Sequence, residues 1–327
     1  MSITITGGFS MAGGGFTLVA APPSQATAGW YAGSYDNPVI PSYVQRITFA
    51  TDTATASNRG PLSSGRYGIA AAGNLNYGWF GGGYNGGGKS TVDRITYVTD
   101  TATASIRGPL SNSYYYKGAT GNDTTGYWAG GWYYSQNTIS KITYATDTAT
   151  ATASGPLSKP RNAFNGVTDK TTYGWFGGGY GIPSAPAPRT NFSDIDRITY
   201  ASDTSTAVSR GSLPTAVWYY GSTNTDTYGW YACGSIPGFA GSQNIYRLTF
   251  ATDTATASSR GTIPATLKGI SGSGDSTYGW FAGGQSPSTS NEVNTYRVTY
   301  ANDTASATSR GGLFTYVYLG SASSGIQ

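Results

Sequence analysis

The sequence contains no histidine, one cysteine and one glutamate, and only 10% of its 327 residues are charged. Without histidine, the chain cannot build a histidine-based catalytic triad, a histidine metal site or imidazole acid–base chemistry. The lone Cys233 excludes internal disulfides and cysteine metal cages, and we interpret it as a buried, inert thiol. Glu292 is the only glutamate. Asp194 and Asp196 are close to each other in sequence, and we interpret them as loop solvation rather than as paired catalytic carboxylates. We therefore expect no enzymatic activity, no cofactor and no bound metal.

Other absences narrow the class of protein further. The net charge is only +4 and the sequence has no run of basic residues, so we expect no nucleic-acid partner. No stretch of 18 apolar residues is present, so we expect no membrane span. The first residues lack the lysine or arginine that begins a usual secretory signal.

The residues that are abundant favour strands. Helices need charged residues on their outer faces, and this chain has few of them. It has 48 glycines and 27 tyrosines, together with many serines and threonines. These residue types are typical of short strands and tight turns. The composition therefore predicts an all-β fold.

Six copies of a unit of roughly 50 residues organise the chain. A first phrase, R-I-T-F-A-T-D-T-A-T-A, opens with a basic residue at six positions: Arg46, Arg94, Lys141, Arg197, Arg247 and Arg297. A second phrase, Y-G-W-F-G-G-G, recurs in step, with tryptophans at Trp30, Trp79, Trp128, Trp175, Trp230 and Trp280. The units fill residues 25–327 and leave residues 1–24 as an N-terminal arm or an extra strand.

Each unit predicts four strands. In the second copy they are expected at Tyr67–Gly73, Tyr77–Gly82, Val92–Thr99 and Ala102–Ile106, because these segments have small or alternating residues and turn residues between them. Four strands per unit at this period are the signature of a β-propeller. We therefore predict a six-bladed β-propeller of four-stranded antiparallel blades.

The repeat resembles that of the kelch family. The shared features are a glycine pair that closes an apolar strand, an aromatic residue on the next strand, a D-x-T turn and an inner strand of small residues. The tryptophan that kelch repeats carry on the outer strand is missing, and Ala or Thr stands there. The phrase D-R-I-T-Y-A-T-D-T-A-T-A-S also resembles repeats in virion-associated proteins of marine tailed phages, which implies a virion location and a structural role.

The ring has two candidates for its closing strand. The tail segment Tyr316–Ser321 aligns with the inner strands of the other units, and the head segment Phe16–Ala21 lies at the matching distance before Trp30. We favour closure by the C-terminal strand, because strand exchange between the chain ends covers an edge that a sheet must otherwise protect.

The residues that repeat strictly are interpreted as scaffold. The six tryptophans are expected to pack between blades, and the aspartate of each D-x-T turn is expected to stabilise that turn rather than to bind metal. A third phrase, R-G-P-L, starts at Arg59 and Arg107 and returns in looser form at Ser154, Arg210, Arg260 and Arg310. The arginines of this Arg-Gly phrase, and the basic residues that open the first phrase, are expected to make hydrogen bonds or ion pairs between blades. Whether the turn aspartates are their partners stays open.

The residues that break the repeat are the candidates for binding. In a four-stranded blade, the turns between strands one and two and between strands three and four lie on one face, the turn face. The longer loops between strands two and three, and the crossovers between blades, lie on the opposite face, the loop face. Aromatic clusters interrupt the repeat on the loop face, at Trp132, Tyr133, Tyr134, Trp218, Tyr219, Tyr220, Tyr114 and Tyr115. Such clusters suit contact with sugars or protein surfaces; the alternative is that they plug the mouth of the central channel.

Together these patterns favour a non-enzymatic structural or binding module. We expect a phage virion protein, a capsid decoration or a tail-associated component, that contacts other virion proteins or a host receptor or glycan. The alternative is a carbohydrate-binding propeller lectin.

Overall fold

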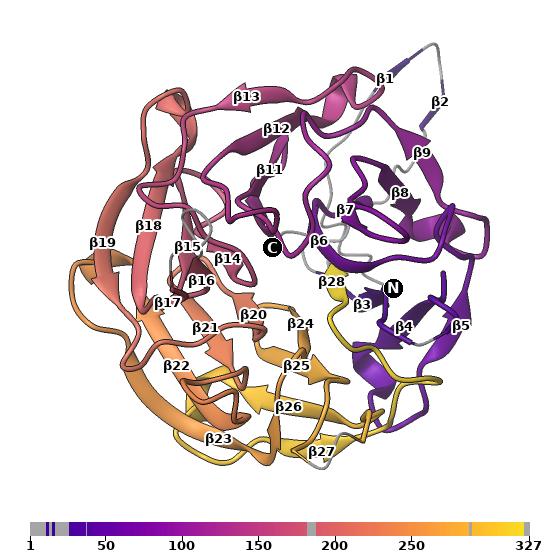
Figure 1. Cartoon of the computed structure of the whole chain (residues 1–327). Coiled ribbons are helices and arrows are strands. Elements are labelled where there is room, and N and C mark those ends of the chain that lie inside the picture. The colour runs from indigo at the N-terminus through magenta and orange to yellow at the C-terminus, as the bar shows by residue number, and fades with distance from the viewer. Residues whose placement is uncertain are drawn as a thin grey trace.

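The fold is a ring of six four-stranded antiparallel sheets around a central axis, a β-propeller (Figure 1). The computed structural model describes residues 26–36, 38–181, 188–287 and 290–323, and the backbone of residues 11–12 and 15–16. The predicted fold class is confirmed. Three of the longer loops between strands two and three, at residues 33–44, 177–193 and 285–294, lie partly outside the described residues.

Each blade has its strands in order from the axis outward. Blade 1 contains β28 (Ser321–Ser323), β3 (Ala28–Ala32), β4 (Val44–Thr48) and β5 (Ser57–Arg59). Blade 2 contains β6 (Tyr67–Gly73), β7 (Tyr77–Tyr84), β8 (Val92–Thr96) and β9 (Ser105–Arg107). Blade 3 contains β10 (Gly118–Gly121), β11 (Thr125–Ala129), β12 (Ile139–Thr143) and β13 (Thr152–Ser154).

The second half of the ring follows the same order. Blade 4 contains β14 (Asn165–Thr168), β15 (Tyr173–Gly177), β18 (Asp194–Thr199) and β19 (Val208–Ser212). Blade 5 contains β20 (Gly221–Asn224), β21 (Tyr228–Ala232), β22 (Ser242–Thr249) and β23 (Ser258–Leu267). Blade 6 contains β24 (Ser271–Gly274), β25 (Tyr278–Ala282), β26 (Thr295–Thr299) and β27 (Thr308–Arg310). Two further hairpins are β1–β2 (Met11–Ala12 and Gly15–Phe16) and β16–β17 (Tyr180–Gly181 and Thr190–Asn191).

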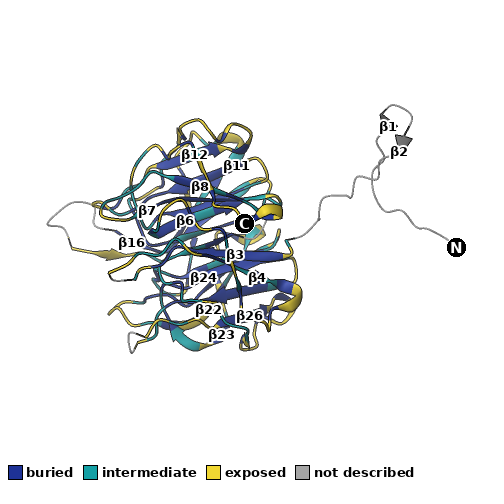
Figure 2. Ribbon diagram, turned by 90° about the vertical axis from the view of Figure 1, so that its right-hand side faces the viewer, coloured by how far each residue is buried: buried dark blue, intermediate teal, exposed yellow. Residues whose placement is uncertain are grey.

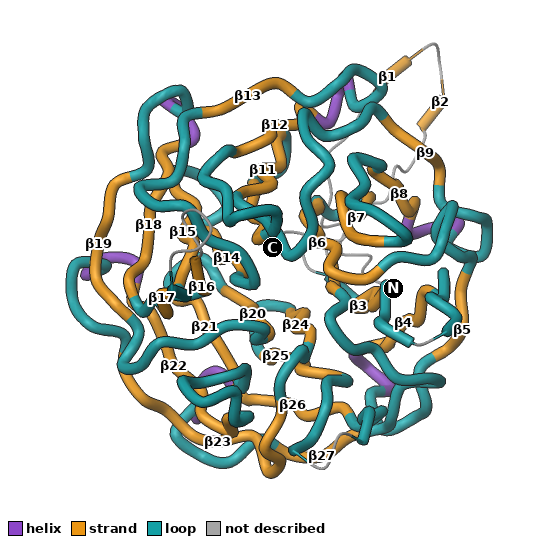
Figure 3. The backbone as a smooth tube through the Cα atoms, in the orientation of Figure 1, coloured by secondary structure: helices purple, strands orange, loops and turns teal. Residues whose placement is uncertain are grey.

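The third strand of every blade ends three residues earlier than the pattern of the second copy predicted. In blade 2 the strand stops at Thr96, and the residues up to Thr99 form one turn of 3-10 helix. The same turn recurs in each blade (Figure 3), as η1 (Phe49–Thr51), η2 (Tyr97–Thr99), η3 (Tyr144–Thr146), η4 (Tyr200–Ser202), η5 (Phe250–Thr252) and η6 (Tyr300–Asn302). The outer strand of blade 2 is likewise β9 at Ser105–Arg107 rather than Ala102–Ile106.

The C-terminal strand closes the ring, as predicted, but it begins later than expected. β28 pairs with β3, with Ser321 opposite Ala32 and Ser323 opposite Trp30. The predicted strand Tyr316–Ser321 is mostly crossover, because Leu319 has a φ of 57° and turns the chain just before β28. Of the rival segment, Phe16 pairs with Met11 in the β1–β2 hairpin. Residues 17–21, and most of the predicted arm at 1–24, lie outside the described residues.

A repeated set of contacts joins neighbouring blades, and we call it the inter-blade layer. In the contact between blades 4 and 5, the Asp253 carboxylate accepts a hydrogen bond from Trp175 Nε1 at 2.7 Å and one from Arg197 Nη1 at 3.0 Å. Arg210, from the Arg-Gly phrase, pairs with the same carboxylate at 2.8 Å. The Trp175 ring stacks on Phe250 of η5 with centroids 4.1 Å apart. The turn aspartates are therefore the partners of the repeated basic residues.

The layer closes around the whole ring. The carboxylate of each turn aspartate pairs with the strand-three basic residue of the preceding blade, in the pairs Arg46–Asp100, Arg94–Asp147, Lys141–Asp203, Arg197–Asp253, Arg247–Asp303 and Arg297–Asp52. The Arg-Gly glycine belongs to the same contact: Gly60 N–H donates to the Asp100 carbonyl, and a Cβ at Gly60 would lie 1.8 Å from the Ala102 oxygen. This close approach explains why the phrase repeats glycine.

Blade 3 departs from the predicted pattern by one residue. Tyr127, not Trp128, occupies the repeat-tryptophan position: it lies opposite Lys141, and its hydroxyl donates to Asp203 at 2.7 Å. Trp128 is one residue later, so its side chain points to the other face of the strand, and its Nε1 donates to the Ala70 carbonyl. The assignment of Trp128 to the tryptophan series was therefore wrong. Tyr127 and Trp128 are both aromatic, so the sequence did not show which of them holds the repeated position.

Candidate functional site

The loop face and the turn face lie on opposite sides of the disc. In Figure 2, which shows the disc edge-on, the loop face is on the left, where the β16–β17 hairpin lies. Eleven large apolar or aromatic side chains are exposed in the described part of the chain, and eight of them lie on this face: Tyr35, Val39, Tyr43, Tyr133, Tyr134, Phe239, Val293 and Phe314. Exposed apolar surface gathered on one face is typical of an interaction site.

A closed ring of backbone hydrogen bonds forms the channel mouth on this face. One residue of each blade, just before or at the start of the inner strand, donates its N–H to the carbonyl of the equivalent residue in the preceding blade. The ring passes through Gly68, Leu319, Gly269, Tyr219, Ala163 and Tyr116, with distances of 2.6 to 3.1 Å. All six residues have positive φ, which is costly for the four that are not glycine. The cavity that these six residues line measures only about 40 Å³, so the channel is narrow here.

Aromatic side chains continue outward from this ring in an unbroken series. Ring centroids lie 4.9 to 6.5 Å apart along a chain of contacts that we call the aromatic series. Its members are Tyr318, Tyr35, Tyr67, Tyr84, Tyr115, Tyr116, Tyr219, Tyr180, Trp132, Trp218 and Phe239. Burial, together with the neighbouring tyrosines, raises the pKa of Tyr67 to about 12, so this phenol is neutral at physiological pH.

Tyr133 and Tyr134 are the most exposed of the predicted binding residues, with exposed fractions of 65% and 51%. Their rings contact each other, with centroids 5.2 Å apart. Tyr133, Tyr134 and Ser135 all have positive φ, and Gln136 holds the turn by donating from Nε2 to the Tyr133 carbonyl at 2.6 Å. A strained turn that holds two aromatic rings in solvent is typical of a functional loop.

Three predicted residues line the same surface but are half-buried. Trp132 contacts Tyr180 at 5.8 Å between ring centroids, and its N–H donates to the Tyr115 carbonyl. Tyr115 continues the aromatic series, whereas the Tyr114 ring lies under the ammonium group of Lys117 at 5.2 Å. These residues connect the exposed turn to the channel mouth.

The second predicted cluster lies mostly below the surface. Trp218 is only 1% exposed and packs against Tyr180 and Phe239. Tyr220 is also buried, and its hydroxyl donates to the Gly177 carbonyl. Tyr219 is half-buried and packs on Tyr116 over the channel mouth. Trp218 and Tyr220 are placed to support the surface, not to touch a ligand.

Sequence reasoning missed three residues that complete this surface. Tyr180 lies in the β16–β17 hairpin, Phe239 is exposed in the β21–β22 loop, and Arg189 is exposed just before β17. The Arg189 guanidinium lies 5.4 Å from the ring centroids of Tyr180 and Phe239 and 5.9 Å from that of Trp132. The repeat contains no equivalent of these loop residues, so only their position in space brings them together.

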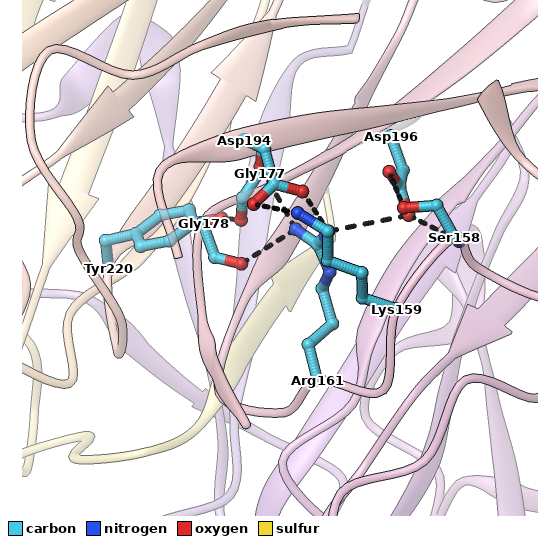
Figure 4. Close-up of polar contacts among 8 residues, drawn as sticks. All are labelled: Ser158, Lys159, Arg161, Gly177, Gly178, Asp194, Asp196 and Tyr220. Atoms are coloured by element: carbon cyan, nitrogen blue, oxygen red, sulfur yellow. Dashed lines mark hydrogen bonds and ion pairs between the residues drawn. The ribbon is translucent and has the colours of Figure 1, made fainter. Parts of the chain in front are cut away.

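A buried ion-pair cluster anchors the base of this hairpin (Figure 4). Arg161 is fully buried and donates to the carbonyls of Gly178 and Asp194 at 3.0 Å and to the Asp194 carboxylate at 2.5 Å. Asp196 is also fully buried and accepts from Ser158 Oγ at 2.6 Å. Burial alone would raise the pKa of Asp194, but the Arg161 guanidinium lowers it below its usual range. The interpretation of these aspartates as loop solvation was therefore wrong, because their partner lies more than 30 residues away in sequence.

The two faces differ in their unpaired charges. Among the described residues, four cations have no carboxylate within ion-pair distance, and all four lie on the loop-face side: Lys89, Lys117, Arg189 and Lys268. Among the same residues, the turn face carries three carboxylates without a basic partner, Asp123, Asp169 and Asp275, and the loop face carries two, Asp36 and Glu292. Lys117 is buried, its Nζ donates to Asn112 and to the Gly130 carbonyl, and burial lowers its pKa to about 7.

Within the described ranges, no group of three or more cysteine, aspartate or glutamate side chains is placed to hold a metal ion. Burial raises the pKa of the Cys233 thiol well above its usual value, which keeps it protonated. Over the same residues, no helix is both long and apolar enough to cross a membrane. No protein-family model matches the chain, and no curated protein is significantly similar to it.

Proposed function

We propose that the protein is a non-enzymatic recognition module that contacts its partner through the loop face. One observation carries this proposal: of the eleven large apolar or aromatic side chains that are exposed among the described residues, eight lie on that face. They surround an aromatic series that crosses five of the six blades, and large aromatic anchors dominate the binding energy of most interfaces.

The proposal includes a place in a phage virion and kelch-like repeats. The support is the resemblance of the D-R-I-T-Y-A-T-D-T-A-T-A-S phrase, together with the glycine pairs and D-x-T turns of the repeat. The inter-blade layer, with its paired charges, stabilises a disc that can carry variable loops. The partner would be another virion protein or a host receptor.

Mass spectrometry of purified phage particles that encode the chain tests the location. We expect peptides of this chain at a constant ratio to the major capsid protein through successive gradient steps. Loss of these peptides during purification, while capsid peptides remain, would reject the virion location.

A carbohydrate-binding lectin is the second candidate, and one observation favours it. The exposed rings of Tyr133, Tyr134 and Phe239 are rigid and set among polar loops, and the two tyrosines add hydroxyl groups, as in surfaces that bind sugars. A glycan array probed with the purified protein separates the two: selective glycan binding supports the lectin, and binding only to virion proteins supports the structural role.

A further inference from the structure

Three aromatic rings surround the exposed Arg189 on the loop face. These rings come from three different blades: Trp132 from blade 3, Tyr180 from the hairpin of blade 4 and Phe239 from the loop of blade 5. A guanidinium can lie against aromatic rings and still direct its N–H groups outward. No carboxylate of the described residues pairs with Arg189, so its donors are available to a ligand.

The rings around Arg189 rest on a fixed base. Tyr180 and Trp218 are buried beneath it, and the Trp218 ring contacts both Tyr180 and Phe239. The buried Arg161 cluster ties the start of the hairpin to the blade. A site whose parts are already held in place loses less conformational entropy when a ligand binds.

The chemistry around Arg189 selects the ligand. A planar guanidinium donates two parallel hydrogen bonds to a carboxylate, and this geometry is specific. Flat exposed rings suit the C–H face of a pyranose better than a peptide that needs a groove.

We propose that Arg189 and its aromatic frame bind a carboxylate-bearing saccharide. The carboxylate pairs with the Arg189 guanidinium, and the sugar ring lies on Trp132 or Phe239. This inference rests on the proposed use of the loop face, and it names the chemical class of the ligand there.

The experiment measures the affinity of the full-length protein for matched pairs of probes by isothermal titration calorimetry. One pair is trigalacturonic acid and its methyl ester, and the other is 3′-sialyllactose and lactose. Hexaglutamate serves as an acidic peptide. The variant is Arg189→Gln, and the matched control is Lys89→Gln, which removes an unpaired cation from the same face but outside the aromatic frame. Arg189 is exposed and Lys89 has no acidic partner among the described residues, so the melting temperature of both variants should equal that of the wild type.

We expect at least one acidic sugar to bind ten or more times more tightly than its neutral partner. Arg189→Gln should remove this preference, and Lys89→Gln should change it less than threefold. Equal affinity for acidic and neutral sugars, no binding of any sugar, a preference that survives Arg189→Gln, or binding of hexaglutamate alone would each overturn the proposal.

A separate variant distinguishes failure of the acidic-sugar site from failure of the proposed function. Tyr133→Ala combined with Tyr134→Ala removes loop-face contact area but leaves Arg189 intact. If the double variant loses binding to the native partner while Arg189→Gln binds every probe as the wild type does, the loop face is the recognition surface and the acidic-sugar site is wrong. If the double variant keeps full partner binding, the proposed function fails as well.

Discussion

The inter-blade layer and the loop face use the same residue types in opposite ways. In the layer, every tryptophan or tyrosine stacks on the next blade, and every arginine or lysine faces an aspartate. On the loop face, aromatic rings reach solvent, and basic residues such as Arg189 and Lys268 have no acidic partner among the described residues. The comparison teaches that the strict repeat marks residues that contact one another between blades, whereas the aromatic residues exposed on the loop face lie where the chain departs from the repeat.

The largest effect is expected from a change in the layer. Trp175→Ala removes a fully buried ring, its stacking on Phe250 and its hydrogen bond to Asp253. We expect the free energy of unfolding to fall by about 4–5 kcal/mol, measured by urea denaturation. The matched control is Tyr134→Ala on the loop face. A loss below about 1 kcal/mol for Trp175→Ala would contradict the structural role of the layer.

The next largest loss of stability is expected for a buried residue of the loop face, Trp218. Trp218 belongs to a repeat-breaking cluster, yet it is buried, and its Nε1 has no hydrogen-bond partner in the described structure. Trp218→Ala should therefore lower the free energy of unfolding by about 3 kcal/mol, less than Trp175→Ala because no hydrogen bond is lost. Unchanged stability with weaker partner binding would place Trp218 among the contact residues instead.

Much of this comparison could be predicted from the sequence. Strict repetition was enough to predict the six blades and the scaffold role of the tryptophans, aspartates and arginines, because each repeat makes the same contact with its neighbour. Closure by the C-terminal end was also predicted, although its strand starts at Ser321. Register inside one blade was harder: the pair Tyr127-Trp128 offers two aromatic residues for one position.

Burial on the loop face could not be predicted in the same way. Trp132 and Trp218 have the same sequence context, a tryptophan followed by two tyrosines, but only Trp218 is covered, by Tyr180 and Phe239 of other loops. The frame around Arg189 likewise joins segments from three blades. Such sites depend on which loops of different blades lie close together in space, and the repeat does not determine this.

An intermediate effect concerns the buried Lys117, whose pKa is lowered to about 7 by burial. Between pH 7 and pH 9 the unfolded chain keeps the lysine proton while the folded chain releases it, so stability should rise with pH. The expected gain is about 2 kcal/mol over this range, since each pH unit contributes up to about 1.4 kcal/mol per proton. Urea denaturation at several pH values measures it.

Lys117→Met is the control for that pH dependence. Its nonpolar side chain fills the same space without a charge, so the rise between pH 7 and pH 9 should disappear. An identical pH profile in the variant would show that another group titrates in this window.

The smallest effect on stability is expected for the exposed pair. Tyr133→Ala with Tyr134→Ala should change the free energy of unfolding by less than about 0.5 kcal/mol per residue, because both rings lie in solvent. Partner binding, measured by biolayer interferometry on immobilised particles or host cells, should weaken at least about tenfold. A large loss of stability with unchanged binding would remove the distinction between this turn and the layer.

Hydrogen exchange of the protein, free and bound to its native partner, tests most directly whether recognition belongs to the loop face. The account predicts that binding slows exchange in the loops near residues 33–36, 83–91, 131–138 and 234–241, and leaves the turns near residues 74–76, 122–124 and 225–227 unchanged. Protection confined to those turns, with the loops exchanging as in the free protein, would contradict it.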